Sequence, residues 1–359
     1  MGMTAEAADT KDRFQIGITR DFLTANGELT YRDIGLGLLD AEPQCRYAFF
    51  AESHNPVRAE QIASLDAVLS LAPAWTTKTL AEGAERLLLV ARFGVGYDMC
   101  DIAAFTANDV LLTITPGATD LPVAGGILGM MLALTRRLLV KDRLVREGRW
   151  QERAHYQGME IAGKTLGIVG FGGAGRQLRR LVAPFAMKVL AYDPYVPDAV
   201  LEAEGVQRTE SLGELFSRSD CISIHCLLNE QTRGLINRDL FRLMKPTAYF
   251  FNAARGPIVN ENDLIAALQS GSLAGAGLDV FEQEPPAPDN PLLKMENVLL
   301  TPHSVCWTDE CFQAIGESAV RSLLAVVHGG TPFGLLNPEV LEQEGFQAKR
   351  SALQARLQG

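Results

Sequence analysis

The chain has 359 residues, of which 47% are hydrophobic and 21% charged, and it carries a formal net charge of −10. This length exceeds one ordinary domain and suits two, and the composition is that of a globular protein with a large buried core. The negative charge argues against nucleic acid or an anionic membrane as a standing partner.

Targeting and membrane signals are weak along the whole chain. Residues 1–12 are polar and acidic and lack the apolar stretch of a signal peptide. The most apolar run, 121–134, is fourteen residues long, shorter than the roughly 18–20 residues that cross a bilayer. The six cysteines form no Cys-x-x-Cys pair and no zinc-ligand spacing, so we expect reduced thiols, a cytoplasmic protein and no metal.

The N-terminal part, to about residue 115, alternates short apolar segments with helical patterns and predicts a small α/β domain. After a turn at 115–118, a long helix is predicted over 121–148, joining this domain to the next. Strands are predicted at 14–18, 47–51, 67–71 and 87–91.

The segment 165–303 repeats a strand–helix alternation with continuous apolar strands, a pattern typical of a parallel sheet covered on both faces. One helix is predicted over 262–270, with an Asn available as N-cap and Gly271 just past its end. Another helix, over about 309–327, is expected to cross back to the first domain. Strands are predicted at 165–169, 188–192, 221–225, 248–252, 277–281 and 298–301.

A glycine motif, G-x-G-x-x-G, directly follows the first strand of this second region and precedes a helical stretch. Gly170 permits a tight turn, Gly172 lets the backbone approach a pyrophosphate, and Gly175 allows close packing of helix on strand. The amides of Gly173 and Ala174 open the helix, where the helix dipole favours anionic phosphates. The motif therefore predicts a dinucleotide site.

The second strand of this region ends in Asp193, about twenty residues after the last glycine of the motif. An acid at this distance accepts hydrogen bonds from the adenine ribose hydroxyls in NAD-binding proteins. A carboxylate there would repel a 2′-phosphate, and no Arg or Lys follows within 194–197 to counter it. The sequence therefore predicts NAD rather than NADP.

Three later strands are each followed by a residue that can act on a carbonyl group: Arg255, Glu284 and His303. The carboxyl ends of parallel strands face the ligand crevice, so we expect these side chains to lie together. Arg can hold a carboxylate with two parallel hydrogen bonds, His can supply a proton, and a carboxylate beside it orients and stabilises the protonated ring. Each residue alone has an ordinary structural explanation, but their joint placement predicts hydride transfer to a 2-keto acid.

Four ordered segments resemble the D-isomer-specific 2-hydroxyacid dehydrogenase family, which includes phosphoglycerate dehydrogenases and glyoxylate/hydroxypyruvate reductases. The resemblance covers about residues 14–328. It implies a Rossmann-type doubly wound parallel sheet as the NAD-binding domain, at 116–303, and a smaller flavodoxin-like α/β substrate domain, formed by 1–115 and 304–359. The segments that carry it are Gly170 to Gly175, Ala253 to Ile258, Gly275 to Pro285 and Asn297 to His303.

The resemblance also implies roles for single residues. Arg255 would bind the substrate, His303 would be the acid/base, and Glu284 its partner. Asp279 would contact the nicotinamide carboxamide. The expected cofactor-binding residues are Gly170, Gly172, Gly173, Ala174, Gly175, Asp193, Ala253, Ala254, Arg255, Asp279 and His303. The expected substrate-binding residues are Arg255, His303, and Val95 and Gly96 of a glycine-rich turn whose amides would hold the substrate carboxylate.

The expected function is NAD-dependent hydride transfer between nicotinamide and a small D-2-hydroxy acid or 2-keto acid, by a homodimer. Two alternatives remain open. A formate dehydrogenase shares the fold, but its family pairs Gln with the His, so Glu284 argues against it. An NAD-sensing corepressor-like scaffold also shares the fold and keeps the Arg, Glu and His, so only turnover separates it from an enzyme.

Overall fold

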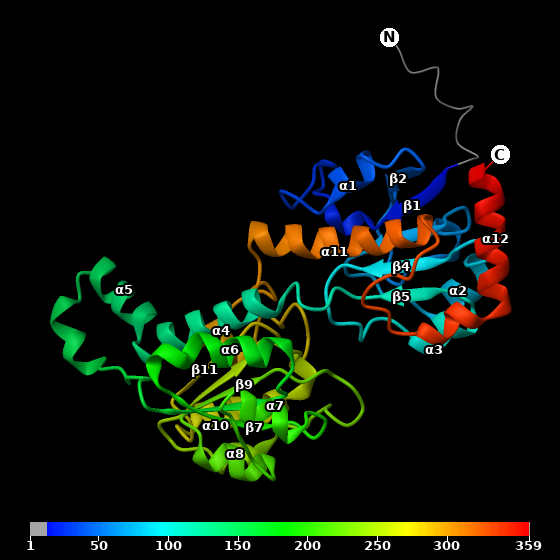
Figure 1. Cartoon of the computed structure of the whole chain (residues 1–359). Coiled ribbons are helices and arrows are strands. Elements are labelled where there is room, and N and C mark those ends of the chain that lie inside the picture. The colour runs from blue at the N-terminus through cyan, green and yellow to red at the C-terminus, as the bar shows by residue number, and fades with distance from the viewer. Residues whose placement is uncertain (1–12, 359) are drawn as a thin grey trace. The chain divides into compact units, whose positions relative to one another are not determined.

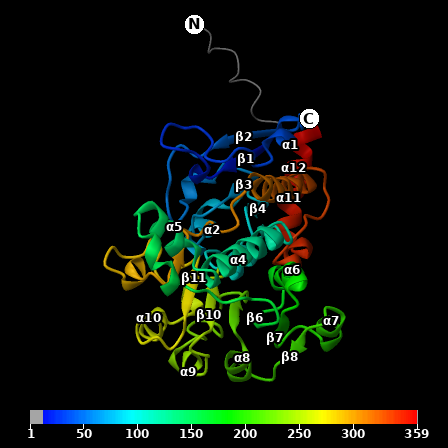
Figure 2. The ribbon, with the colours of Figure 1, turned by 90° about the vertical axis from the view of Figure 1, so that its left-hand side faces the viewer.

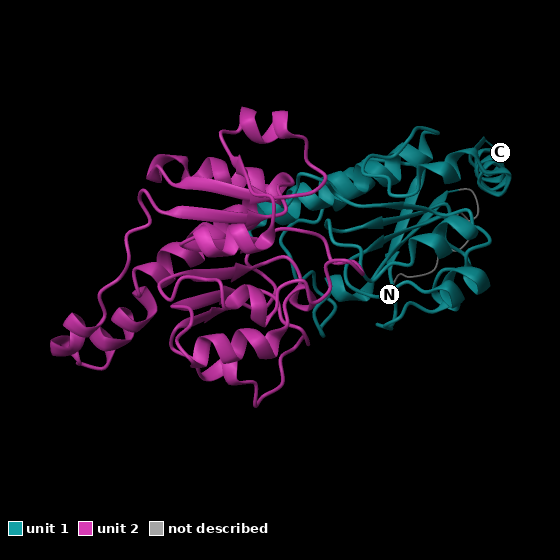
Figure 3. Ribbon diagram, turned by 90° about the horizontal axis from the view of Figure 1, so that it is seen from below, with its two compact units in different colours: residues 1–119, 308–359 teal, residues 120–307 magenta. Residues whose placement is uncertain are grey.

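The computed structural model describes residues 13–358, which divide into two compact units (Figure 3). Unit 1 combines the residues up to 119 with those from 308 onward, and unit 2 comprises residues 120–307. The sequence places the domain boundaries at 115/116 and 303/304, four residues earlier at each crossing. Each unit contains one parallel β-sheet.

The sheet of unit 2 has seven parallel strands in the order β12-β11-β10-β9-β6-β7-β8 (Figure 2). From β6 the chain adds two strands on one side and then returns to add four on the other, the doubly wound order of a Rossmann sheet. The expected fold of this region is confirmed. The strands are β6 (Thr165–Val169), β7 (Lys188–Tyr192), β8 (Gln207–Arg208), β9 (Cys221–Ile224), β10 (Tyr249–Asn252), β11 (Gly275–Leu278) and β12 (Val298–Leu300).

Helices cover both faces of this sheet, and a separate apolar cluster lies on each face. On one face, α4 and α6 pack in the cluster that contains Phe251 of β10. On the other face, α8 and α10 pack in the cluster that contains Phe250. Phe250 and Phe251 lie on different faces because neighbouring side chains of a strand point to opposite sides of the sheet. The helices are α4 (Asp120–Thr135), α5 (Leu138–Arg146), α6 (Gly173–Val182), α7 (Asp198–Ala203), α8 (Leu212–Arg218), α9 (Arg238–Phe241) and α10 (Glu261–Gln269).

The single helix predicted over 121–148 is wrong, since the structure has two helices, α4 and α5, with a break between them. Arg137, at the break, has a positive φ of 53°. The amide of Met159 donates to the carbonyl of Thr135 (2.7 Å), which occupies the oxygen that a continuing helix would use. Within residues 13–358 no single helix is long and apolar enough to cross a membrane, although α4 and α5 together, bent by 59°, meet the criteria of length and composition.

All six cysteines are free thiols. Burial raises the pKa of Cys45, Cys100 and Cys221 to about 12, so these thiols stay protonated and unreactive near neutral pH. Within the part of the chain that the structure describes, no group of three or more His, Cys, Asp or Glu side chains could hold a metal ion.

The sheet of unit 1 has five parallel strands in the order β2-β1-β3-β4-β5, the flavodoxin-like order that the sequence resemblance implies (Figure 1). The strands are β1 (Phe14–Ile18), β2 (Cys45–Phe49), β3 (Ala67–Ser70), β4 (Leu89–Arg92) and β5 (Leu111–Thr113). The helices are α1 (Leu36–Asp40), α2 (Thr77–Gly83), α3 (Ile102–Ala107), α11 (Asp309–Val327) and α12 (Glu344–Gln358).

The long helix α11 belongs to unit 1 and packs on β3 and β4. Its buried side includes Val320 and Leu323, both fully buried. It approaches the turn before α1 very closely, since a Cβ on Gly316 would overlap the backbone of Ile34. The C-terminal helix α12 is attached to the same unit by Lys349, which donates to the carbonyls of Leu87 and Asn108.

Candidate active site

The glycine motif lies between the carboxyl end of β6 and the start of α6. Gly170 has a φ of +87°, and a Cβ there would lie 2.6 Å from the amide nitrogen of Cys226. Gly172 is the N-cap of α6 and has no side chain to cover the first amides of the helix. A Cβ on Gly175 would lie 2.7 Å from the carbonyl of Gly170. Side chains are thus excluded where the backbone would approach a pyrophosphate, and the loop fits a dinucleotide.

Asp193 follows β7 and lies beside this loop. Its Oδ2 accepts a hydrogen bond from the amide of Phe171 (2.8 Å), and its Oδ1 accepts from Tyr195 (2.9 Å) and Val196 (3.1 Å). Arg208, which the sequence analysis did not consider, donates to the carbonyl of Asp193 (2.7 Å) and also pairs with a carboxylate, that of Asp198. Its guanidinium is therefore already engaged and offers little to a 2′-phosphate.

His303 and Glu284 form a close pair after β12 and β11. Nδ1 of His303 lies 2.7 Å from Oε2 of Glu284, and Oε1 of Glu284 accepts from the amide of Phe281 (3.0 Å). Burial acts to raise the pKa of Glu284, but the hydrogen bonds from His303 and Phe281, with the charges of His303 and Arg255, outweigh it and hold that pKa below its usual value. Glu284 is therefore ionised at neutral pH.

Arg255 follows β10, the strand next to β11, and its charge reaches Glu284. The buried side chain of Asn252 fixes the backbone here, since its Nδ2 donates to the carbonyl of Arg255 (2.9 Å) and its Oδ1 accepts from the amide of Ala254 (3.0 Å). The structure thus brings together the three residues that the sequence predicts for carbonyl chemistry, at the carboxyl ends of three adjacent strands.

The backbone of His303 is held in an unusual conformation by Asp279. His303 has a φ of 51°, which is costly for a residue other than Gly. Its amide donates to the carbonyl of Asp279 (2.8 Å), and Oδ1 of Asp279 accepts from the amides of Ser304 (2.7 Å) and Val305 (3.0 Å) and from the hydroxyl of Thr301 (2.6 Å). Burial raises the pKa of Asp279, and these hydrogen bonds offset part of that effect. Asp279 therefore shapes the turn that presents the imidazole.

Val95 and Gly96 belong to unit 1, in the turn after β4, whereas the other predicted site residues belong to unit 2. The turn contains Gly94, with a φ of +126°, whose carbonyl accepts from the amide of Thr115 (3.0 Å). The structure describes the glycine-rich turn within unit 1, and the set of Arg255, Glu284 and His303 within unit 2.

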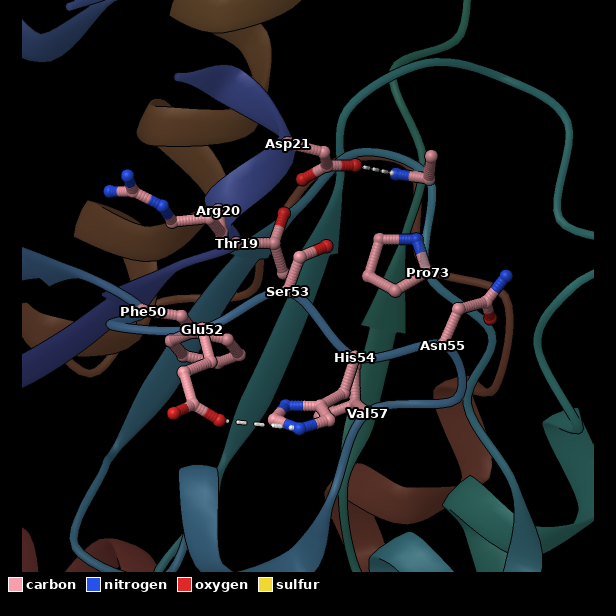
Figure 4. Close-up of a pocket in the computed structure, with 11 residues that line it drawn as sticks. Thr19, Arg20, Asp21, Phe50, Glu52, Ser53, His54, Asn55, Val57 and Pro73 are labelled. Atoms are coloured by element: carbon pink, nitrogen blue, oxygen red, sulfur yellow. Dashed lines mark hydrogen bonds and ion pairs between the residues drawn. The ribbon is translucent and has the colours of Figure 1, made fainter. Parts of the chain in front are cut away.

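Unit 1 also has a cavity of about 180 Å³ at the carboxyl ends of β1, β2 and β3 (Figure 4). The order of the strands reverses between β1 and β3, which is where ligands bind in open α/β sheets. Two buried polar atoms here lack a hydrogen-bond partner, Oδ1 of Asp21 and Nδ1 of His54. Sequence reasoning missed this cavity because its lining comes from three separate loops without a motif: Thr19, Arg20, Asp21, Phe50, Glu52, Ser53, His54, Asn55, Val57, Ala72 and Pro73.

Comparison with known proteins gives one consistent family. The model for the NAD-binding domain of D-isomer specific 2-hydroxyacid dehydrogenases matches residues 128–304. A glyoxylate reductase of Korarchaeum cryptofilum is 38% identical over 302 residues, which are 83% of this chain and 91% of that protein. The chain belongs to the D-isomer-specific 2-hydroxyacid dehydrogenase family. It is thus an NAD(P)-dependent oxidoreductase that acts on CH–OH groups.

Other members of the family differ in length and substrate. The D-3-phosphoglycerate dehydrogenase of Methanocaldococcus jannaschii is 36% identical over 285 residues, and this chain spans only about half of it (54%). The D-mandelate dehydrogenase of Rhodotorula graminis has a TM-score of 0.78 at 26% identity, covering 90% of this chain and 97% of that one. A D-lactate dehydrogenase of Aquifex aeolicus, solved with NAD and lactic acid, has a TM-score of 0.76 at 27% identity, covering 88% and 96%.

Proposed function

We propose that the chain transfers a hydride between NADH and a small 2-keto acid, and in reverse from a D-2-hydroxy acid to NAD. The observation that carries the proposal is the 2.7 Å contact between His303 and Glu284, with Arg255 in the loop after the adjacent strand β10. An acid/base, its charged partner and an anion-binding guanidinium are the groups that carbonyl reduction requires. Glyoxylate reductase and D-lactate dehydrogenase relatives support a small acid as substrate.

The residues of unit 2 suggest how each step is performed. When bound, the nicotinamide of NADH supplies the hydride. The planar guanidinium of Arg255 would hold the substrate carboxylate or carbonyl with two hydrogen bonds. Because Nδ1 of His303 is bonded to Glu284, Nε2 is the ring atom left to give a proton to the carbonyl oxygen in reduction and to take it back in oxidation. The ionised Glu284 stabilises the protonated ring and fixes its orientation.

We assign cofactor binding to unit 2, and we assign to unit 1 further contacts with the substrate, in addition to those of Arg255 and His303. The glycine motif and Asp193 support the first assignment, with Ala253, Ala254 and Asp279 as further residues toward the cofactor. The turn at Val95 and Gly96 supports the second, as does the cavity of unit 1. The unpartnered oxygen of Asp21 in that cavity would accept a hydrogen bond from a hydroxyl group of the substrate.

The proposed function is tested by NADH oxidation with glyoxylate, hydroxypyruvate, pyruvate, 2-ketobutyrate and phenylpyruvate. We expect turnover of at least one of these acids, with kcat/KM at least about tenfold higher for NADH than for NADPH, because Asp193 repels the 2′-phosphate. The variant Asp193→Ala should narrow that ratio. Reduction of NAD by formate, without reduction of any of these keto acids by NADH, would show a formate dehydrogenase, and no turnover with intact NADH binding would show a scaffold.

We further propose a homodimer that forms through the segment around α5. Apolar side chains are exposed there, among them Leu138 (51%), Val145 (58%) and Trp150 (57%). Exposed apolar side chains that lie together commonly mark a surface that is covered by another protein chain, and a second copy of this chain would bury them. Light scattering should give twice the chain mass for the wild type and for the control Leu243→Glu, on another exposed surface, but a monomer for Val145→Glu. A monomeric wild type would contradict the proposal.

A further inference from the structure

The first residue of α4, Asp120, places its carboxylate against the glycine loop. A Cβ on Gly173 would overlap this carboxyl group, and the three atoms nearest to that position all belong to Asp120. Gly173 is the first residue of α6, and α4 and α6 pack along each other (Figure 1). The carboxylate therefore shares the small space at the amino end of α6 that the pyrophosphate of a cofactor would approach.

Two electrostatic effects on a bound phosphate oppose each other at the amino end of α6: the helix end attracts it, and Asp120 repels it. The uncapped amides and the dipole at the amino end of α6 favour an anion, so the loop suits a phosphate. Asp120 brings a negative charge of its own to the same location. The charged group that faces it is Arg176, in the first turn and a half of α6. An ionised Asp120 would therefore repel the cofactor phosphates at this place.

The protonation state of Asp120 decides whether its carboxyl group attracts or repels the phosphates of the cofactor. Burial raises the pKa of Asp120 above its usual range, and the charge of Arg176 offsets part of that effect. Below this pKa the carboxyl is neutral and its hydroxyl can donate to a phosphate oxygen. Above it the carboxylate can only accept, and it repels the phosphate.

We propose that Asp120 limits the affinity for the cofactor by placing an ionisable carboxyl in the phosphate cradle, so that binding weakens as the pH rises. The proposal rests on the dinucleotide site proposed for unit 2. It assigns to Asp120 an effect on cofactor affinity that no sequence motif indicates. A cofactor held less tightly at neutral pH also leaves more readily after each turnover.

The test uses ADP-ribose, which carries the pyrophosphate and withstands mild acid, and adenosine, which has no phosphate. Affinities are measured by calorimetry from about pH 4.5, close to the ordinary pKa of a carboxyl group, to about pH 8. The proteins are the wild type, Asp120→Asn and Asp120→Ser, with Asp239→Asn as a control that removes an exposed charge on α9. Both Asn and Ser are well tolerated near a helix amino end, so α4 should be retained.

For the wild type we expect the dissociation constant of ADP-ribose to rise about tenfold across this pH range, as expected for one like charge near a partly screened phosphate. Both Asp120 variants should lose most of this rise and bind about tenfold more tightly at the alkaline end. Adenosine should bind all four proteins alike, and Asp239→Asn should match the wild type. If the Asp120 variants bind ADP-ribose with wild-type affinity and pH dependence, the inference is wrong. If ADP-ribose binds none of the proteins, the dinucleotide site itself is wrong.

Discussion

Replacement of His303 by Asn is expected to lower kcat for keto-acid reduction by about 10²–10⁴-fold, the usual contribution of a positioned general acid. Asn is the suitable substitute because it tolerates the left-handed backbone that His303 adopts, with a φ of 51°, so the turn built by Asp279 should survive. The dissociation constant of NADH, measured by fluorescence titration, should rise far less than kcat falls, because the glycine motif and Asp193 hold the rest of the cofactor. A variant that keeps more than about a tenth of wild-type kcat would remove His303 from the acid/base role.

The partner of His303 gives a second variant for the same prediction. The pKa of Glu284 lies below its usual value, so Glu284 is ionised over the assay range, and Glu284→Gln removes that charge. Reduction uses the protonated ring, so its rate falls as the pH rises, and this limb should move to lower pH in the variant. Oxidation uses the neutral ring, so it should persist to lower pH than in the wild type. A loss of rate that is equal at every pH would show an orienting role without an electrostatic one.

The second large effect is expected at Arg255. Lys keeps the charge but loses the planar fork that makes two parallel hydrogen bonds, so Arg255→Lys should raise KM for the keto acid, lower kcat, and reduce kcat/KM about 10²-fold. NADH binding should be nearly unchanged. The control Arg242→Lys, at an exposed position directly after α9, should behave as wild type. Wild-type kinetics for Arg255→Lys would contradict bidentate binding by this residue.

The sequence predicts the strands of the two sheets better than it predicts the helices that pack on them. The bounds of β1, β6 and β7 agree with the predicted ranges, because each is a short, mostly apolar segment. The strand predicted at 277–281 begins two residues earlier, since Gly275 allows close approach to β12, where its Cβ would lie 2.4 Å from the carbonyl of Asn297. The strands β5 and β8 are too short to show a pattern, and no helix is predicted where α12 lies.

The sequence predicts the residues that carry the chemistry of the site, but it does not predict the residues that hold the surrounding backbone in place. Arg255, Glu284 and His303 each follow a strand, and the parallel sheet alone predicts that they meet. The bonds from Asp279 to the turn after β12 depend on the path of the backbone, and no motif describes that path. Asp120 lies far from the glycine loop in sequence, and only the packing of α4 along α6 brings its carboxyl there.

The division of the chain has a consequence for biosynthesis. Unit 2 is one continuous segment, 120–307, so the ribosome delivers it whole and it can fold as soon as it emerges. Unit 1 is split: its sheet is made first, and α11, the helix that covers β3 and β4, is made only after unit 2. Until α11 emerges, the surface that receives Val320 and Leu323 stays exposed. The N-terminal segment of unit 1 therefore stays incompletely folded, with apolar surface exposed, while unit 2 folds after it.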